Sequence, residues 1–178
     1  YNGVLENFTF SNSADYFKNE INCILNEQYS SAFVNGVLLN TDNQNHEIKT
    51  NIKHLSENTK SYQKIKTVID KNSKAIFQGK IFVDKKAQKT NGYQLSKAIL
   101  LDKESEFNSK PELEIYADDV KCSHGSTSGS LDENAIFYLM SRGLSEFEAK
   151  KLLIKGFLTE VVESITNEEI KKYFLKRI

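Results

Sequence analysis

The chain has 178 residues, and its 24 basic side chains balance its 24 acidic ones to give a net charge of zero. This balance argues against a surface for nucleic acid or for an anionic membrane as the main function. No apolar run approaches the length of a membrane-spanning helix. The two cysteines, Cys23 and Cys122, lie far apart and form no C-x-x-C pair, so we expect a reducing compartment and no disulfide scaffold. The sequence opens at Tyr1 inside a patterned run, and we expect it to be a piece of a longer polypeptide, truncated on its N-terminal side.

Residues 1–126 mostly alternate between polar and apolar side chains, which is the period of a β-strand. Polar corners such as 84–86, 90–92 and 118–119 separate the short runs. The rows that share a face are Ile48, Thr50, Ile52 and His54; Ile65, Thr67 and Ile69; Ala75, Phe77, Gly79, Ile81 and Val83; Leu113, Ile115 and Ala117; and Val120, Cys122 and His124. The pattern predicts many short strands.

Tight hairpin turns are scarce in this region, since only Asn35-Gly36 and Asn91-Gly92 have the composition of a two-residue turn. Short strands that turn at corners every few residues suit a β-solenoid, in which each coil stacks on the one before it. No strict repeat motif is present, and a β-sandwich would give nearly the same local pattern. The strand pattern alone leaves both architectures open.

The pattern changes near Ser126, after which three capping boxes follow one another. Each consists of a Ser or Thr with a Glu three residues later, at the start of a helical run. The pairs are Ser130 and Glu133, Ser145 and Glu148, and Thr166 and Glu169. The first helix is expected to run to about Arg142 and to stop at Gly143. The sequence therefore predicts a β domain over residues 1–126 and an α-helical C-terminal domain over residues 127–178.

Cys122 and His124 are the strongest candidates for chemistry. Residues two apart on a strand project to the same side, so the thiol and the imidazole are expected to point together. This makes them a pair of potential metal ligands or a pair for sulfur chemistry. One Cys and one His are at best half of a metal site. The structural alternative is a buried small side chain beside a hydrogen-bonded histidine.

The other histidines and the first cysteine have structural interpretations. His54 shares a face with isoleucines and is predicted to be a hydrogen-bonded core histidine. His46 lies in a polar run and is predicted to be exposed. Cys23 is predicted to pack among its apolar neighbours.

Two polar pairs also have structural interpretations. Asp118 and Asp119 point to opposite faces of a strand, so they suit hydrogen bonds at a corner better than shared acid–base chemistry. Gln78 and Gln94 are expected to form side-chain ladders between stacked coils.

A larger set of segments resembles a known family. The similarity runs from about residue 54 to residue 157 and is densest over residues 110–125, K-P-E-L-E-I-Y-A-D-D-V-K-C-S-H-G. Further matching segments are 77–81, 87–90, 92–94, 131–132, 137–139 and 141–143. In this order they resemble the C-terminal half of the SufB/SufD family of iron–sulfur cluster assembly scaffold proteins. Gly125 stands where the SufB branch typically has Glu, which favours the SufD branch.

The resemblance implies a right-handed parallel β-helix followed by a small helical domain. It also implies a complex with a SufB homologue, paired through the β-helices, and with the ABC-type ATPase SufC, docked on the helical domain. His124 is implied to bind a nascent iron–sulfur cluster transiently at the interface with SufB, and Cys122 matches the neighbouring cysteine. Because a cluster needs about four ligands, the partner would supply the others. The residues expected to contact a partner are Phe137, Tyr138, Leu139, Arg142 and Gly143.

The expected function is that of a non-catalytic scaffold subunit. We expect it in the bacterial cytoplasm or in a plastid-type organelle, and we expect the isolated protein to be able to form a homodimer. No GxxxxGK[ST] loop is present, so ATP hydrolysis is assigned to SufC. Two alternatives stay open. One is a carbohydrate-active β-helix enzyme, which would need clustered acids with Lys or Arg on one face of the solenoid. The other is an inert structural partner of SufC.

Overall fold

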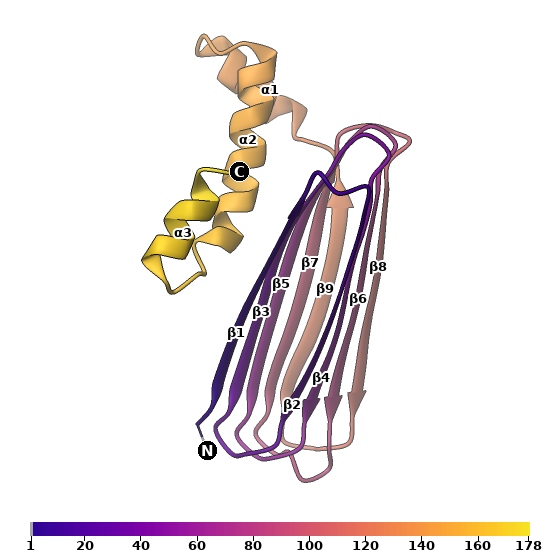
Figure 1. Cartoon of the computed structure of the whole chain (residues 1–178), viewed down its shortest axis with the longest axis vertical. Helices are drawn as coiled ribbons and strands as arrows, with labels where there is room; N and C mark the ends of the chain where they lie inside the picture. Colours follow the sequence, from indigo (N-terminus) through magenta and orange to yellow (C-terminus); the bar gives the residue numbers. More distant parts are fainter. Residues whose placement is uncertain (1) are drawn as a thin grey trace.

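The computed structural model describes residues 2–178 (Figure 1). Within these residues, nine strands form an elongated stack, and three helices follow toward the C-terminus. The strands are β1 (Val4–Asn12), β2 (Tyr16–Leu25), β3 (Ser31–Asn40), β4 (Asn45–His54), β5 (Lys60–Ile69), β6 (Lys74–Val83), β7 (Asn91–Leu100), β8 (Glu106–Ile115) and β9 (Lys121–Gly129). The helices are α1 (Glu133–Ser141), α2 (Glu146–Val162) and α3 (Glu168–Leu175).

Successive strands alternate between two sheets. β1, β3, β5, β7 and β9 form the odd sheet in that order, and β2, β4, β6 and β8 form the even sheet. All strand pairs are parallel, so each turn of the chain adds one strand to each sheet. This arrangement is a parallel β-solenoid, and it excludes the sandwich alternative, whose sheets are antiparallel. The predicted solenoid with helices after it is confirmed, and β9 continues to Gly129, past the boundary expected between residues 126 and 127.

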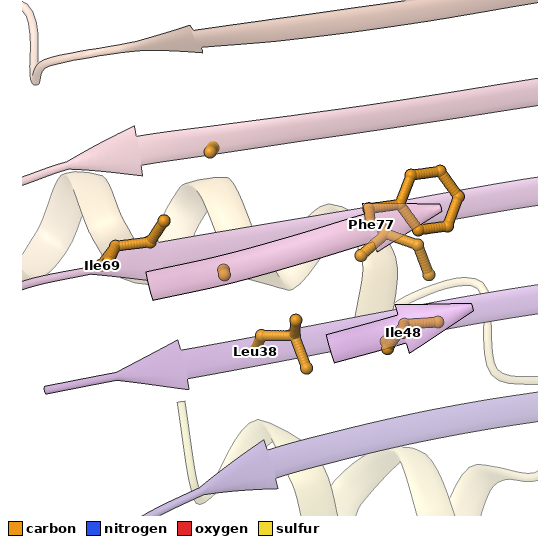
Figure 2. Packing of buried hydrophobic residues seen from close by; sticks show 7 residues of the cluster. Leu38, Ile48, Ile69 and Phe77 are labelled. Carbon is orange, nitrogen blue, oxygen red and sulfur yellow. The ribbon is translucent and has the colours of Figure 1, made fainter. Parts of the chain in front are cut away.

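The core lies between the two sheets. Because side chains alternate along a strand, stacked strands put every second residue into the same interior column. Leu38 and Ile69 from the odd sheet meet Ile48 and Phe77 from the even sheet there, and all four are fully buried (Figure 2). Burying a side chain of this size stabilises the fold by about 2 kcal/mol. The inward rows predicted for β4, β5 and β6 are confirmed by this burial.

Residues other than glycine take left-handed backbone conformations at the corners. Tyr29, Asn58 and Lys89 occupy equivalent corners of successive turns, with φ values of 62°, 57° and 58°. Such values are uncommon for residues with a side chain, although Asn adopts them more readily. The backbone N–H of Asn58 donates to the Gln88 carbonyl, and that of Lys89 donates to the Asp119 carbonyl. The corners at Asn58 and Lys89 are therefore each hydrogen-bonded to the corner of the next turn.

Two of the three predicted helix caps are displaced. The N-cap of α1 is Asp132, whose carboxylate accepts from a backbone N–H of the first turn, so the prediction of Ser130 is wrong. The N-cap of α3 is Asn167 and not Thr166. The Thr166 hydroxyl instead donates to the Glu6 carboxylate at the start of the solenoid. In both cases a carbonyl-bearing side chain, which accepts well from N–H groups, lies closer to the helix than the hydroxyl.

The remaining helix-end predictions are confirmed. Ser145 and Glu148 form the reciprocal capping box at the start of α2. α1 ends at its C-cap Arg142, and Gly143 follows with a φ of 96°, a conformation that favours glycine.

α2 and α3 lie against the outer face of the odd sheet (Figure 1). The buried residues of this contact are Val37, Val68, Leu158, Val161, Val162 and Ile165. The ring of Phe174 on α3 lies 4.9 Å from the ring of Phe8 and 5.2 Å from that of Phe10, both on β1. The helical subdomain is thus fixed to the solenoid by an apolar contact as well as by the chain.

Candidate metal-ligand site at the end of the solenoid

β9 is the last strand of the odd sheet and pairs only with β7 among the described strands. Its register places Cys122 beside Gly92 and His124 beside Gln94. Gly92 and Gln94 belong to the inward row of β7, so Cys122 and His124 also face the interior. Two contacts support this orientation. A Cβ built on the inward residue Gly92 would lie 3.3 Å from the Cys122 sulfur. The hydroxyl of Ser126, which has the same strand parity, accepts from the inward Ser96 hydroxyl of β7 at 3.1 Å. The prediction that the thiol and the imidazole share one side is confirmed.

The end of the solenoid beyond β8 and β9 is open. No further turn covers the inward residues of these two strands in the described chain, so Phe107, Leu113 and Cys122 are only half-buried. The backbone groups along the outer edges of β8 and β9 likewise have no strand partner there. An open end of this kind leaves inward side chains accessible from one direction.

Cys122 is the more enclosed of the two candidates. Its side chain packs against the apolar cluster that contains Ile81, Val83 and Ala87. Burial raises the pKa of the Cys122 thiol, and a hydrogen bond from the Gly92 backbone opposes this rise in part. The thiol therefore stays protonated at neutral pH unless a metal ion or a cationic group displaces the proton.

His124 has a different environment. It is exposed, and within residues 2–178 no hydrogen bond or ion pair fixes its ring. Both ring nitrogens are therefore available to a ligand that approaches from the open end.

Cys122 and His124 form only part of a metal site. Across residues 2–178, no group of three or more His, Cys, Asp or Glu side chains is arranged to hold a metal ion. A cluster held by about four ligands would need further donors from outside this chain.

A polar network lies directly behind His124 in the interior. The Thr50 hydroxyl donates to the Gln63 side-chain oxygen, and the Gln63 amide donates to the Gln94 oxygen at 3.4 Å. The Gln94 amide in turn donates to the Gly79 carbonyl at 3.2 Å. We call Gln63 and Gln94 the glutamine ladder. The predicted ladder partner Gln78 is wrong, because Gln78 is one residue away from the inward position of Gly79 and faces outward.

The other two histidines are both core residues. His54 is fully buried between the hydroxyls of Thr59 and Ser61, at 2.8 Å and 2.9 Å, as predicted. Burial lowers the pKa of His54 to about 4. The prediction that His46 is exposed is wrong, since it is fully buried and its Nε2 lies 2.7 Å from the Ala14 carbonyl. The polar neighbours of His46 concealed that it has the same strand parity as the buried residues of β4.

The remaining polar candidates have no catalytic arrangement. Cys23 is half-buried and packs against Leu25, Ala32 and their neighbours, as predicted. The Asp119 backbone N–H donates to the Gln88 side-chain oxygen at 2.9 Å, which places the aspartate pair at a hydrogen-bonded corner.

The residues expected to contact a partner lie in the second half of α1 and directly after it. Phe137 and Tyr138 are 74% and 56% exposed, and the Arg142 guanidinium stacks on the Tyr138 ring at 5.3 Å. Leu139 is half-buried, and Gly143 is exposed after the helix. Phe147, at the start of α2, adds a ring that is 75% exposed and that the sequence patterns did not single out. Large exposed aromatic side chains are typical of protein-contact surfaces.

None of the helices in residues 2–178 is long and apolar enough to cross a membrane.

Comparison with known proteins defines the class of the chain. Residues 1–157 match the family described as SUF system FeS cluster assembly, SufBD core domain. The chain belongs to this SufBD family of iron–sulfur cluster assembly proteins.

The similar curated proteins point within the family to SufD. The chain is 38% identical over 154 residues to the iron–sulfur cluster assembly protein SufD of Escherichia coli, which covers 86% of this chain and 36% of that protein. It is 44% identical over 100 residues to a SufBD family protein of Synechocystis, covering 56% of this chain and 22% of the relative. It is 41% identical over 104 residues to the protein ABCI7, chloroplastic, of Arabidopsis thaliana, covering 58% of this chain and 22% of that relative. The chain thus spans between about a fifth and about a third of these relatives.

Proposed function

We propose that this chain is the C-terminal part of a SufD-type scaffold subunit, which offers His124 to an iron–sulfur cluster assembled between it and a SufB homologue. The observation that carries the proposal is the position of His124, an unfixed imidazole on the inward row of the last strand, at the open end of the solenoid. A metal site that includes His124 would need further ligands from outside the described residues. Membership of the SufBD family supports iron and sulfide as the cargo of the site.

The SufB homologue would pair with the open end of the solenoid. The free edges of β8 and β9 carry backbone donors and acceptors that another β-helix can pair with. The nascent cluster would then lie between the two subunits, with His124 as one ligand. Cys122 would be a supporting thiol whose burial keeps it protonated until an iron ion displaces the proton.

The SufC ATPase would dock on the helical subdomain. Phe137, Tyr138 and Phe147 supply an exposed aromatic surface, and Arg142 and Gly143 complete its rim at the end of α1. ATP hydrolysis is assigned to this partner, and the chain itself is proposed to be non-catalytic. We place the protein in the bacterial cytoplasm, or in a plastid-type organelle if its source is eukaryotic, as the bacterial and chloroplast relatives suggest.

The test is replacement of His124 by Ala in the full-length protein, produced together with its SufB and SufC homologues. We expect the variant to fold and to co-purify with both partners, but to yield less iron and sulfide per complex and less activity of iron–sulfur enzymes in cells. Thr127→Ala, an outward replacement on the same strand, is the matched control and should behave as wild type. Unchanged iron and sulfide in the His124 variant would overturn the proposed role, and a chain that binds neither partner would overturn the scaffold assignment.

A further inference from the structure

The residue directly behind His124 in the solenoid is Gln94, and hydrogen bonds hold its side chain in place. The two residues are register partners on β9 and β7, and both face the interior. Neighbouring strands lie about 4.8 Å apart, so the Gln94 side chain occupies the layer on which the imidazole rests. Gln94 is only 2% exposed, and its amide is bonded on both sides, by Gln63 and by the Gly79 carbonyl.

The even sheet leaves space for this amide. A Cβ built on Gly79 would lie 2.6 Å from Cδ and 2.8 Å from Oε1 of Gln94, which is closer than real contacts allow. The long side chain of Gln94 therefore crosses the interior from β7 to β6 only because position 79 has no side chain. A glycine in a strand interior weakens the strand, and close approach by another group is the usual reason for one.

The network extends the support to the opposite sheet. Gln63 holds the Gln94 oxygen, and Thr50 on β4 holds the Gln63 oxygen. Fully bonded polar side chains in an interior are held in one arrangement. The layer beneath His124 is thus rigid and polar, whereas His124 itself has no orienting hydrogen bond to any residue between 2 and 178.

From these contacts we infer that Gln94 is the positioning residue of His124: locked by Gly79 and the glutamine ladder, it closes the interior beneath the imidazole and holds the ring toward the open end. The inference rests on the proposed function for its biological meaning, but its geometry can be tested without any cluster. A shorter side chain at position 94 leaves a space into which the imidazole turns, away from a partner.

The experiment measures how fast diethyl pyrocarbonate modifies His124 in the full-length protein at neutral pH. Trypsin releases residues 122–142 as one peptide with His124 as its single histidine, so mass spectrometry follows this residue alone. We expect Gln94→Ala to slow the modification by about threefold or more, because the ring sinks into the vacated space. Gln94→Met, which fills a similar volume, should restore most of the wild-type rate.

Two controls keep the test specific. His46 and His54 are fully buried, and their continued protection from the reagent reports that a variant is folded. Gly79→Ala should change the His124 rate because it displaces the Gln94 amide, whereas Gly129→Ala, with nothing within 4 Å of its Cβ, should not. If Gln94→Ala exposes the buried histidines, Gln94→Asn is the milder replacement, with a smaller decrease in rate expected.

The outcomes separate this inference from the proposed function. An unchanged rate in a folded Gln94→Ala variant overturns the positioning role, even if His124→Ala abolishes cluster assembly. A slower rate, combined with normal cluster assembly in the His124→Ala variant, confirms the geometry and overturns the ligand role. When both hold, Gln94→Ala should also lower iron and sulfide in the complex, and Gln94→Met should restore them.

Discussion

The ammonium group of Lys66 lies 2.6 Å from the carboxylate of Glu160, although the two residues are 94 positions apart in the chain. The Lys66 side chain is 3% exposed, and it also donates to the Phe157 carbonyl at 2.6 Å and lies over the Phe157 ring at 4.4 Å. Lys64 reaches the other oxygen of Glu160 at 3.0 Å. Two lysines of β5 thus hold one carboxylate of α2, and they join the helical subdomain to the middle of the odd sheet.

Replacing Glu160 by Ala should destabilise the protein by about 2 kcal/mol, because it leaves the buried Lys66 ammonium without a carboxylate. The value lies below that for a fully buried pair, since Glu160 is half-exposed and Lys66 keeps its contacts with Phe157. Urea denaturation of wild type and variant gives the difference in the free energy of unfolding. Glu163→Ala, which removes a similarly exposed carboxylate whose ion pair with Lys171 is longer at 3.8 Å, should cost less than about 0.5 kcal/mol. Equal losses in the two variants would contradict the role of the Lys66 contact.

The same contact should make stability depend on acid. Lys66 and Lys64 lower the pKa of Glu160 to about 2, below its ordinary value of 4.5. The carboxylate therefore stabilises the folded state fully above about pH 4.5, and this contribution is lost as the pH falls toward 2. Because Glu160 is half-exposed, we expect an effect of only about 1 kcal/mol. The wild-type advantage over Glu160→Gln should shrink between pH 5 and pH 2.5, and a constant difference over that range would refute this assignment.

His54 should give a second pH dependence at higher pH. Its folded pKa of about 4 lies below the ordinary value of 6.5, so the unfolded chain binds the proton more readily between these values. The free energy of unfolding should therefore fall as the pH drops from 6.5 to 4, by on the order of 3 kcal/mol for this one group. His54→Gln, which can still bond Thr59 or Ser61, should flatten the curve. Since burial also lowers the pKa of His46, a smaller slope should persist in the variant; identical slopes in both proteins would argue against the assignment.

The exposed aromatic surface on α1 should affect binding without affecting stability. Phe137→Ser removes a ring that is 74% exposed, so the free energy of unfolding should change by less than about 0.5 kcal/mol. Binding of the SufC homologue should fall strongly, as measured by co-purification or by calorimetry. Tyr16→Ser, at a residue 62% exposed on β2, is the matched control and should bind normally. Normal binding by the Phe137 variant would place the ATPase elsewhere.

Much of the solenoid could be predicted from local pattern. Alternation in the middle strands identified the inward rows, because in-register parallel strands bury the same parity throughout. The Ser145 cap was predictable, since both of its hydrogen bonds lie within four residues. Asp132 and Asn167 were harder to predict, because several polar residues precede each helix and the position at which the chain enters the helix decides which of them caps it.

The contacts between distant segments were not predictable in the same way. Lys66 looks like an exposed charge in the sequence, and only the position of α2 on the odd sheet buries it. To place Gln94 behind His124, one must know how many residues make up one coil. The interior hydrogen bonds between coils recur at separations of 29 to 31 residues. That spacing could have served as a signal in the sequence. It is hard to detect, because equivalent positions in successive coils must both face inward but need not carry the same side chain.

The uncovered edge at β8 and β9 has a consequence for the protein when it is produced alone. A row of unpaired backbone groups on a parallel sheet is a template on which further strands can add. Overproduced alone, the protein should therefore tend to join with its own copies and come out of solution at high concentration. If the proposed function is correct, a complementary subunit synthesised at the same time would occupy the edge before another copy does.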